Sequence, residues 1–242
     1  YYKGEGVPQD IDLSFELMHK SAELGSSGGQ CALGEMYRLS RDYEQAEHWF
    51  LIAAEEGAAF AQHCLGLMHL RGDGVTQNSA KAKEWCLKAA KQGEVEAQLS
   101  LGRMYADGAG IEKDAESAIF WFEQAANAGN AMAQFNLAAM HYDGSAGQQN
   151  FDEAMRWFHA SAEKGFSPAQ YYLGQLYSNG IGVGQDLQQA IKWYRQAAEQ
   201  GHVDAQCNLG VAALHGHGID PDRHKAEEWL RAAAEQGHGL AS

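Results

Sequence analysis

The chain contains little proline, few cysteines and no long apolar segment. Only 3 of its 242 residues are proline, against 28 glycines, so helices separated by glycine turns are expected. No run of about 18 apolar residues occurs, which argues against a helix that inserts into a membrane. The 4 cysteines show neither a CxxC motif nor regular spacing. We therefore expect free, mostly buried thiols rather than a disulfide framework or a metal site.

Basic residues are also scarce. Lysine and arginine number 18 against 32 aspartates and glutamates, which gives a formal net charge of −14. Such a field repels phosphate backbones and anionic lipid heads, so we expect no nucleic-acid partner and no membrane insertion. A protein or peptide, above all a basic one, is the partner class that the charge favours. The alternative is that the acidity only maintains solubility.

Motifs for catalysis and phosphate binding are missing. The sequence contains no GxxxxGKS or GxxxxGKT, no HExxH and no GxGxxG placed after a strand. Its many carboxylates recur at expected helix ends instead of converging. We therefore expect that the chain is not an enzyme and holds no cofactor.

The period of the sequence is 36 residues. All six tryptophans follow it: Trp49, Trp85, Trp121, Trp157, Trp193 and Trp229. Columns of alanine, leucine and glycine follow the same spacing. Such a period is typical of stacked helical repeats, in which each unit buries its apolar side against its neighbours. The tryptophans are expected to form the structural core of the repeats, filling the space that the small residues leave.

One repeat, from Ala169 to Gly201, shows the local signals. Apolar and small residues at i, i+4, i+7 and i+8 from Ala169 predict a helix, which the glycines from Gly180 onward end. Asp186 is placed to cap a second helix, and Gly201 is placed where a helix ends in a left-handed residue. Each repeat is therefore an antiparallel helix pair.

The fold class that follows is all-α, an α-solenoid of six full helix pairs and one leading helix. We expect one domain over residues 1–242, with a partial unit at 1–25 and full units at about 29–57, 61–93, 97–129, 133–165, 169–201 and 205–237. The chain begins inside a repeat and stops near Ala241, where another should begin. We interpret it as a piece of a longer array, so any targeting segment would lie upstream and the compartment stays open.

The repeats resemble the Sel-1-like repeat family, a relative of the tetratricopeptide repeats. The residues that carry the resemblance are LGQLYSNGIGV and AIKWYRQAAEQG in 169–201, and LGRMYADGAGI and AIFWFEQAANAG in 97–129. Local departures occur, such as the loop DGSAGQQ in the unit from Ala133. The resemblance implies a right-handed superhelical scaffold, a right-handed α-solenoid, that binds proteins or peptides, with bacterial members acting as adaptors. A cysteine-rich subgroup has a regularly spaced disulfide that this sequence lacks, although a bridge between Cys64 and Cys86 stays open.

The resemblance also implies that the first helices line a concave wall. On these helices, several residues opposite the packed face are apolar or aromatic, and others beside them are polar. Apolar and aromatic residues on a surface that faces water are typical of a binding groove. We call the predicted binding residues the first-helix wall: His63, Leu67, Leu70, Arg71, Leu99, Arg103, Phe135, Tyr142, Tyr171, Gln175, Asn179 and Leu214. The alternative is that some of them, such as Leu70 or Phe135, only fill the contacts between adjacent first helices.

Several functions remain open. The favoured one is a scaffold or adaptor that binds a partner protein along the concave wall. A narrower alternative is an inhibitor or immunity protein that neutralises a basic toxin or enzyme. A third is a metal-binding solenoid, suggested by His202, Asp204, His215, His217, Asp220, Asp222 and His224 in the last unit. A fourth is an accessory arm of an enzyme whose active part lies elsewhere.

Overall fold

Helices are the only regular secondary structure in the part of the chain that the computed structural model describes, residues 11–145 and 147–237. Their bounds are α1 Ile11–Glu23, α2 Ser27–Leu39, α3 Tyr43–Glu55, α4 Ala59–Arg71, α5 Ser79–Lys91, α6 Val95–Asp107, α7 Ala115–Asn127, α8 Ala131–Asp143, α9 Phe151–Glu163, α10 Ser167–Asn179, α11 Leu187–Glu199, α12 Val203–His215 and α13 Arg223–Glu235. None of these described helices is long and apolar enough to cross a membrane. GEGV at 4–7, Ala146 and Ala241 lie outside the described residues.

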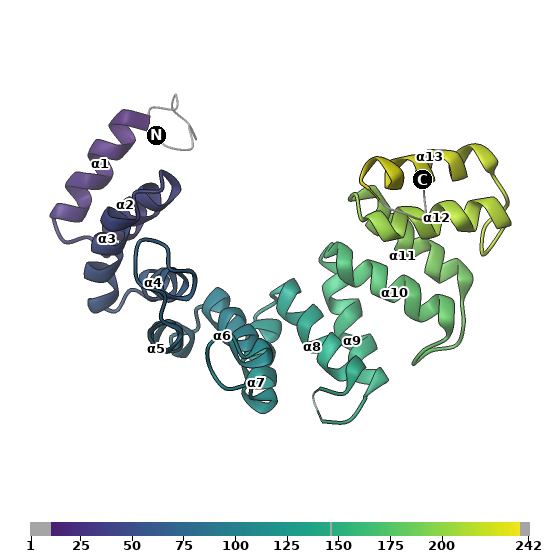
Figure 1. The fold of residues 1–242 in the computed structure, drawn as a ribbon, viewed down its shortest axis with the longest axis horizontal. Helices are drawn as coiled ribbons and strands as arrows, with labels where there is room; N and C mark the ends of the chain where they lie inside the picture. The colour runs from purple at the N-terminus through teal and green to yellow at the C-terminus, as the bar shows by residue number, and fades with distance from the viewer. Residues whose placement is uncertain (1–10, 146, 238–242) are drawn as a thin grey trace. The chain divides into compact units, whose positions relative to one another are not determined.

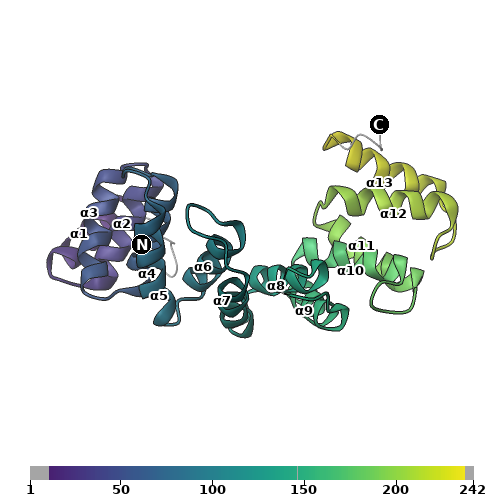
Figure 2. The ribbon, with the colours of Figure 1, turned by 60° about the horizontal axis from the view of Figure 1, so that its bottom comes forward.

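The order of the helices confirms the all-α solenoid. Helix α1 leads, and six antiparallel pairs follow it, from α2–α3 to α12–α13 (Figure 1). We call the even-numbered helices the first helices of their repeats and the odd-numbered ones the second helices. In both Figure 1 and Figure 2 the α12–α13 pair lies on the α10–α11 pair.

The helix ends follow the local signals of the sequence. The Asp186 carboxylate accepts hydrogen bonds from the backbone N–H groups of Gln188 and Gln189, both at 3.0 Å, at the start of α11. Gly201 follows the end of that helix with φ +84°, a conformation that residues with a Cβ adopt at a cost. Local capping therefore sets both ends of α11.

The chain consists of two compact units, residues 1–121 and 122–242, and the division falls within α7. The first unit is built around Phe50, Leu65 and Met68, which are fully buried with the alanines of α3. The second is built around Leu173, Tyr194 and Leu209 on α10, α11 and α12. That the repeats form one solenoid domain over 1–242 stays a prediction.

Close contact within a pair depends on a glycine of the first helix. A Cβ at Gly174 would lie 2.5 Å from the ring of Tyr194, so only glycine lets this ring pack on the helix. The same contact occurs between Gly34 and Phe50, Gly66 and Cys86, and Gly210 and Leu230. Each of these large residues directly follows a tryptophan, so the space that we assigned to the tryptophan is filled by the next residue.

The tryptophans lie instead toward the neighbouring second helices. Trp49 meets His19 of α1 edge to face at 5.6 Å between ring centroids, and Trp193 meets His159 of α9 in the same way at 5.6 Å. Trp157 and Trp193 are buried, while Trp49, Trp85, Trp121 and Trp229 are half-buried. Trp49 and Trp193 therefore each join a repeat to the preceding second helix.

A buried glutamine near the start of each first helix has a role that the sequence did not reveal. The side-chain amide of Gln170 donates to the backbone carbonyl of Ala162 at 3.1 Å, in the preceding repeat. Its Oε1 accepts from Gln200 at 2.7 Å, at the end of its own second helix. Gln62 is held in the same way by Ala54 and Gln92. Gln62, Gln170 and Gln206 therefore each tie three helices together.

The cysteines behave as expected from their lack of pattern. All four are free thiols in the described part of the chain, so the alternative bridge between Cys64 and Cys86 is not formed. Burial raises the pKa of both thiols to about 12. They are packing residues in this fold.

Candidate protein-binding surface

Part of the first-helix wall is turned into the contact between neighbouring first helices. His63 and Leu99 are buried, with 8% and 6% of their surface exposed. The His63 Nε2 lies 3.0 Å from Ser100 Oγ on the next first helix, α6. Burial, with a smaller contribution from Arg71, lowers the pKa of His63 to about 4. These two residues support packing, and we leave them out of the proposed binding surface.

The remaining wall residues of the first unit are accessible to different degrees. Leu67 and Leu70 are half-buried, and Leu70 also packs against the core around α5 and α6. Arg71 and Arg103 are exposed. The wall of this unit therefore combines half-buried aliphatic side chains with exposed guanidinium groups.

In the second unit the same helical positions carry aromatic rings. Phe135 of α8 contacts Phe158, Phe166 and Tyr172, with ring centroids 5.4–5.7 Å apart. Tyr172 in turn stacks on Phe158 at 5.4 Å and 13°. Phe135 and Tyr172 are half-buried, so this set of rings both joins α8 to α10 and reaches the surface.

The aromatic set continues through Tyr171. Its ring stacks on His202 with the centroids 4.5 Å apart, and its hydroxyl accepts a 2.7 Å hydrogen bond from the Gln175 side chain. Burial, followed by the charge of Asp204, raises the pKa of the Tyr171 hydroxyl. Tyr142 packs on Phe151 at the other end of the set. Tyr142, Tyr171 and Gln175 of the predicted wall therefore belong to one surface.

Two aliphatic side chains extend this surface on α12. Leu214 is 45% exposed and Val211 is 39% exposed. Leu214 was among the predicted residues, and Asn179, also predicted, lies exposed at the end of α10. Tyr172 and Asn208 were not singled out from the sequence, and His202 was singled out only as a candidate metal ligand. A search for aromatic and amide residues beside the wall positions would have found them.

The histidines and carboxylates of the last repeat have separate structural roles. His202 caps α12 by accepting from the Ala205 N–H, and the Asp222 carboxylate caps α13 by accepting from the Lys225 N–H. His215 and His217 lie with their ring centroids 5.5 Å apart. Within the described residues no three histidine, cysteine, aspartate or glutamate side chains could hold a metal ion. The metal-binding alternative therefore has no ligand set in that part of the chain.

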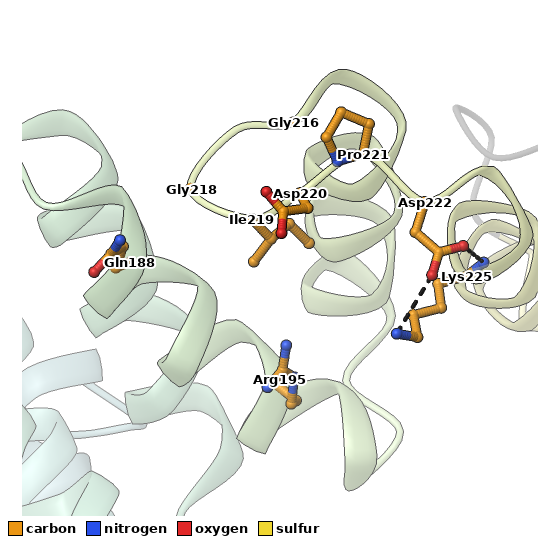
Figure 3. A pocket seen from close by; sticks show the side chains of 9 residues that line it. All are labelled: Gln188, Arg195, Gly216, Gly218, Ile219, Asp220, Pro221, Asp222 and Lys225. Atoms are coloured by element: carbon orange, nitrogen blue, oxygen red, sulfur yellow. Dashed lines mark hydrogen bonds and ion pairs between the residues drawn. The ribbon is translucent and has the colours of Figure 1, made fainter.

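A charged pocket lies beside the loop that follows α12. Figure 3 shows Gln188 and Arg195 of α11 on one side, the loop from Gly216 to Pro221 above, and Asp222 and Lys225 at the start of α13. The Lys225 ammonium pairs with the Asp222 carboxylate at 3.3 Å. Two carboxylates and two cations line this pocket, so its charges balance.

One serine-containing pattern is an exception to the expected lack of catalytic motifs. Residues 25–29 match GxSxG, a pattern that places a nucleophilic serine only when it lies between a strand and a helix. Here Ser27 is the first residue of α2, after a turn that follows α1. The match is therefore part of a helix–helix connection.

Comparison with known proteins supports the assignment of the repeats. The Sel1 repeat family matches residues 1–26, 27–57, 59–94, 95–130, 131–166, 167–202 and 203–238. The fold is similar to that of a protective antigen of uropathogenic Escherichia coli with an SLR fold, at 37% identity and a TM-score of 0.86. That match covers 100% of this chain and 53% of the other, so the chain spans about half the length of that protein.

Two further structures are informative. A Sel1 repeat protein from Oxalobacter formigenes matches at 32% identity and a TM-score of 0.79, over 88% of this chain and 84% of the other. An immunity protein from Pseudomonas aeruginosa matches at 18% identity and a TM-score of 0.50, over 82% and 76%, which is a likeness of fold alone. Sel1 repeat proteins generally mediate protein–protein interactions and are typically not enzymes. With seven matched repeats and this similarity to Sel1 repeat structures, the chain belongs to the Sel1 repeat family.

Proposed function

We propose that this chain is a scaffold that holds a partner protein or peptide on the first-helix wall of its second unit. The observation that carries the proposal is the set of half-buried rings formed by Phe135, Tyr142, Tyr171 and Tyr172, which contact one another directly or through the buried ring of Phe158. Rigid aromatic side chains provide large contact area at a small cost in conformational entropy, which is why they anchor many interfaces.

The net charge of −14 favours a partner with a basic surface. Acidic residues outside the wall would raise the rate of encounter with such a partner, while the rings would provide most of the affinity. Nucleic acid remains excluded from this proposal for the same electrostatic reason.

Affinity capture from a lysate of the natural host, read by mass spectrometry, tests the proposal. The bait is the whole chain, beside a variant with Tyr142→Ala and Tyr171→Ala. We expect one protein to be enriched by the wild type and lost with the variant. Because both tyrosines also pack within the fold, Leu214→Asp at an exposed position serves as a second wall variant.

The matched control is Phe120→Ala, which removes a ring that is 51% exposed on second helix α7 and does not belong to the first-helix wall. This variant should retain the partner. If the tyrosine and Leu214 variants fold normally and still capture the same partner, the wall is not the binding site and the proposal is wrong.

An inhibitor or immunity function is the second candidate. It is supported by the acidity of the chain, and it keeps the same wall but requires that the partner be a toxin or enzyme. An activity assay of the captured partner separates the two. Stoichiometric loss of a partner activity on adding this chain would favour inhibition, and unchanged activity would favour a scaffold.

A further inference from the structure

A small pocket opens beside the aromatic set, between the last two repeats. It has a volume of about 280 Å³ and lies between the end of α10, the first half of α11 and the middle of α12. Pockets for cofactors and drug-sized ligands span about 300–1,000 Å³, so this one lies just below that range and has room for one large amino-acid side chain.

The floor of the pocket is apolar and partly open to solvent. Ile191 and Ala212 are buried there, while Val211 and Leu187 are 39% and 36% exposed. Covering such exposed aliphatic surface with another apolar group lowers the free energy of the complex. The occupant should therefore have an apolar body.

Polar groups at the edge of the pocket are held in position. Tyr194, Asn208 and Ser178 line the pocket together, and burial raises the pKa of the Tyr194 hydroxyl to about 12. The side-chain amide nitrogen of Gln175 donates a hydrogen bond to the Tyr171 hydroxyl. Side-chain amides both donate and accept, and so match the N–H and C=O groups of a peptide backbone.

The charges of this region lie outside the pocket. None of the described residues that line it is an aspartate, glutamate, lysine or arginine, and His217 is the one titratable imidazole at its edge. The neighbouring pocket of Figure 3, by contrast, is lined by Arg195, Asp220, Asp222 and Lys225. A charged group in the first pocket would lose its hydration without gaining an ion pair, which is costly.

We infer that this pocket takes one uncharged side chain, aliphatic or aromatic, from an extended peptide segment of the partner. Leu, Met, Phe or Tyr fits its size and its apolar floor. Asn208 and Gln175 then hydrogen-bond to the peptide backbone on either side of that side chain. The inference rests on the proposed function, because the peptide reaches the pocket along the aromatic set of the same wall.

Selection from a phage-displayed library of random peptides, with the whole chain as bait, tests the inference. We expect the enriched peptides to share one Leu, Met, Phe or Tyr position at which Asp, Glu, Lys and Arg are absent. A synthetic peptide of the most enriched sequence should perturb the NMR signals of the Asn208 side-chain amide. Replacing its anchor by Asp should weaken binding about tenfold or more.

Val211→Asp places a charge at the pocket and should weaken the binding of that peptide about tenfold or more. Met132→Asp is the matched control, since Met132 is 40% exposed in the same unit and does not line the pocket. Val211→Ile should keep the affinity. Circular dichroism and thermal melting would establish that all three variants fold.

The outcomes separate the two proposals. Loss of binding with Tyr142→Ala/Tyr171→Ala but not with Val211→Asp would leave the wall as the binding site and overturn the pocket. The inference is equally overturned if the enriched peptides share no uncharged anchor, or if no peptide is enriched. Binding that survives every wall variant would overturn both proposals.

Discussion

The two units share one framework and differ in what they present on the first-helix wall. In the first unit His63 lies against Ser100 of the next first helix, Leu99 is buried, and the exposed wall carries Arg71 and Arg103. In the second unit Phe135 and Tyr171 occupy the positions of His63 and Leu99. The difference shows that the 36-residue repeat determines the packing, while a few positions per helix determine the surface chemistry.

The largest expected effect tests whether the two frameworks are equivalent. Leu65→Ala in the first unit and Leu173→Ala in the second each empty a fully buried site. Each should lower the free energy of unfolding by about 3 kcal/mol, through lost apolar burial and the cavity that remains. Urea unfolding followed by tryptophan fluorescence measures both. A much smaller loss for either variant would show that its unit is packed less tightly.

The second effect is a pH dependence specific to the first unit. Folding lowers the pKa of His63 from 6.5 to about 4, so the unfolded chain binds more protons between these values. The contribution of neutral His63 is complete above pH 6.5 and is lost as the pH falls toward 4. Between about pH 7.5 and 4.5 the loss of this contribution should lower the free energy of unfolding by roughly 2–3 kcal/mol.

His63→Gln keeps a polar partner for Ser100 and removes the titration. The difference in unfolding free energy between wild type and variant should therefore shrink as the pH falls over that range. The second unit should show no such pH dependence from the equivalent positions, because they hold Phe135 and Tyr171 instead of a histidine. A pH-independent difference for His63→Gln would contradict the assignment of a neutral, buried imidazole.

The smallest effect concerns the buried glutamines. In the second unit Gln134 donates to Ala126 at 3.0 Å, but its buried Oε1 has no hydrogen-bond partner among the described residues. The chain has Lys164 where the equivalent repeats have Gln92, Gln200 and Gln236. Lys164→Gln should therefore supply the missing donor and stabilise the fold by about 1 kcal/mol.

Lys164→Met is the control for that substitution, since it removes the charge without supplying a donor. Thermal melting should rank the glutamine variant above both wild type and Lys164→Met. Equal melting temperatures for the two variants would mean that the bond is not formed. The first unit, where Gln92 already bonds Gln62 at 2.8 Å, provides the reference.

Most of the fold was predictable because its signals are local. The N-cap at Asp186 and the left-handed Gly201 lie within a few residues of the helix ends that they set, and both were confirmed. The role of Trp193 was predicted less well. Its period identified a packed position, but the ring that fills the space at Gly174 belongs to Tyr194, one residue further along.

The candidate surface was less predictable than the fold. The 100° step of the helix placed His63 and Leu67 on the same outward side. Only the structure separated them, since His63 is covered by the next first helix and Leu67 is half-exposed. The distance between neighbouring helices decides this, and it depends on side chains many residues away.

By itself the sequence determined the period of 36, the helix pairs, their caps and the family to which the repeats belong. These features arise from contacts within one repeat or between identical positions of adjacent repeats, so they can be predicted from the amino-acid sequence alone. Tertiary structure alone decided which outward residues fill the contacts between helices and which reach solvent. It also decided that the pocket beside Tyr194 is lined without charges, because its lining residues come from three helices and a loop that meet only when the repeats stack.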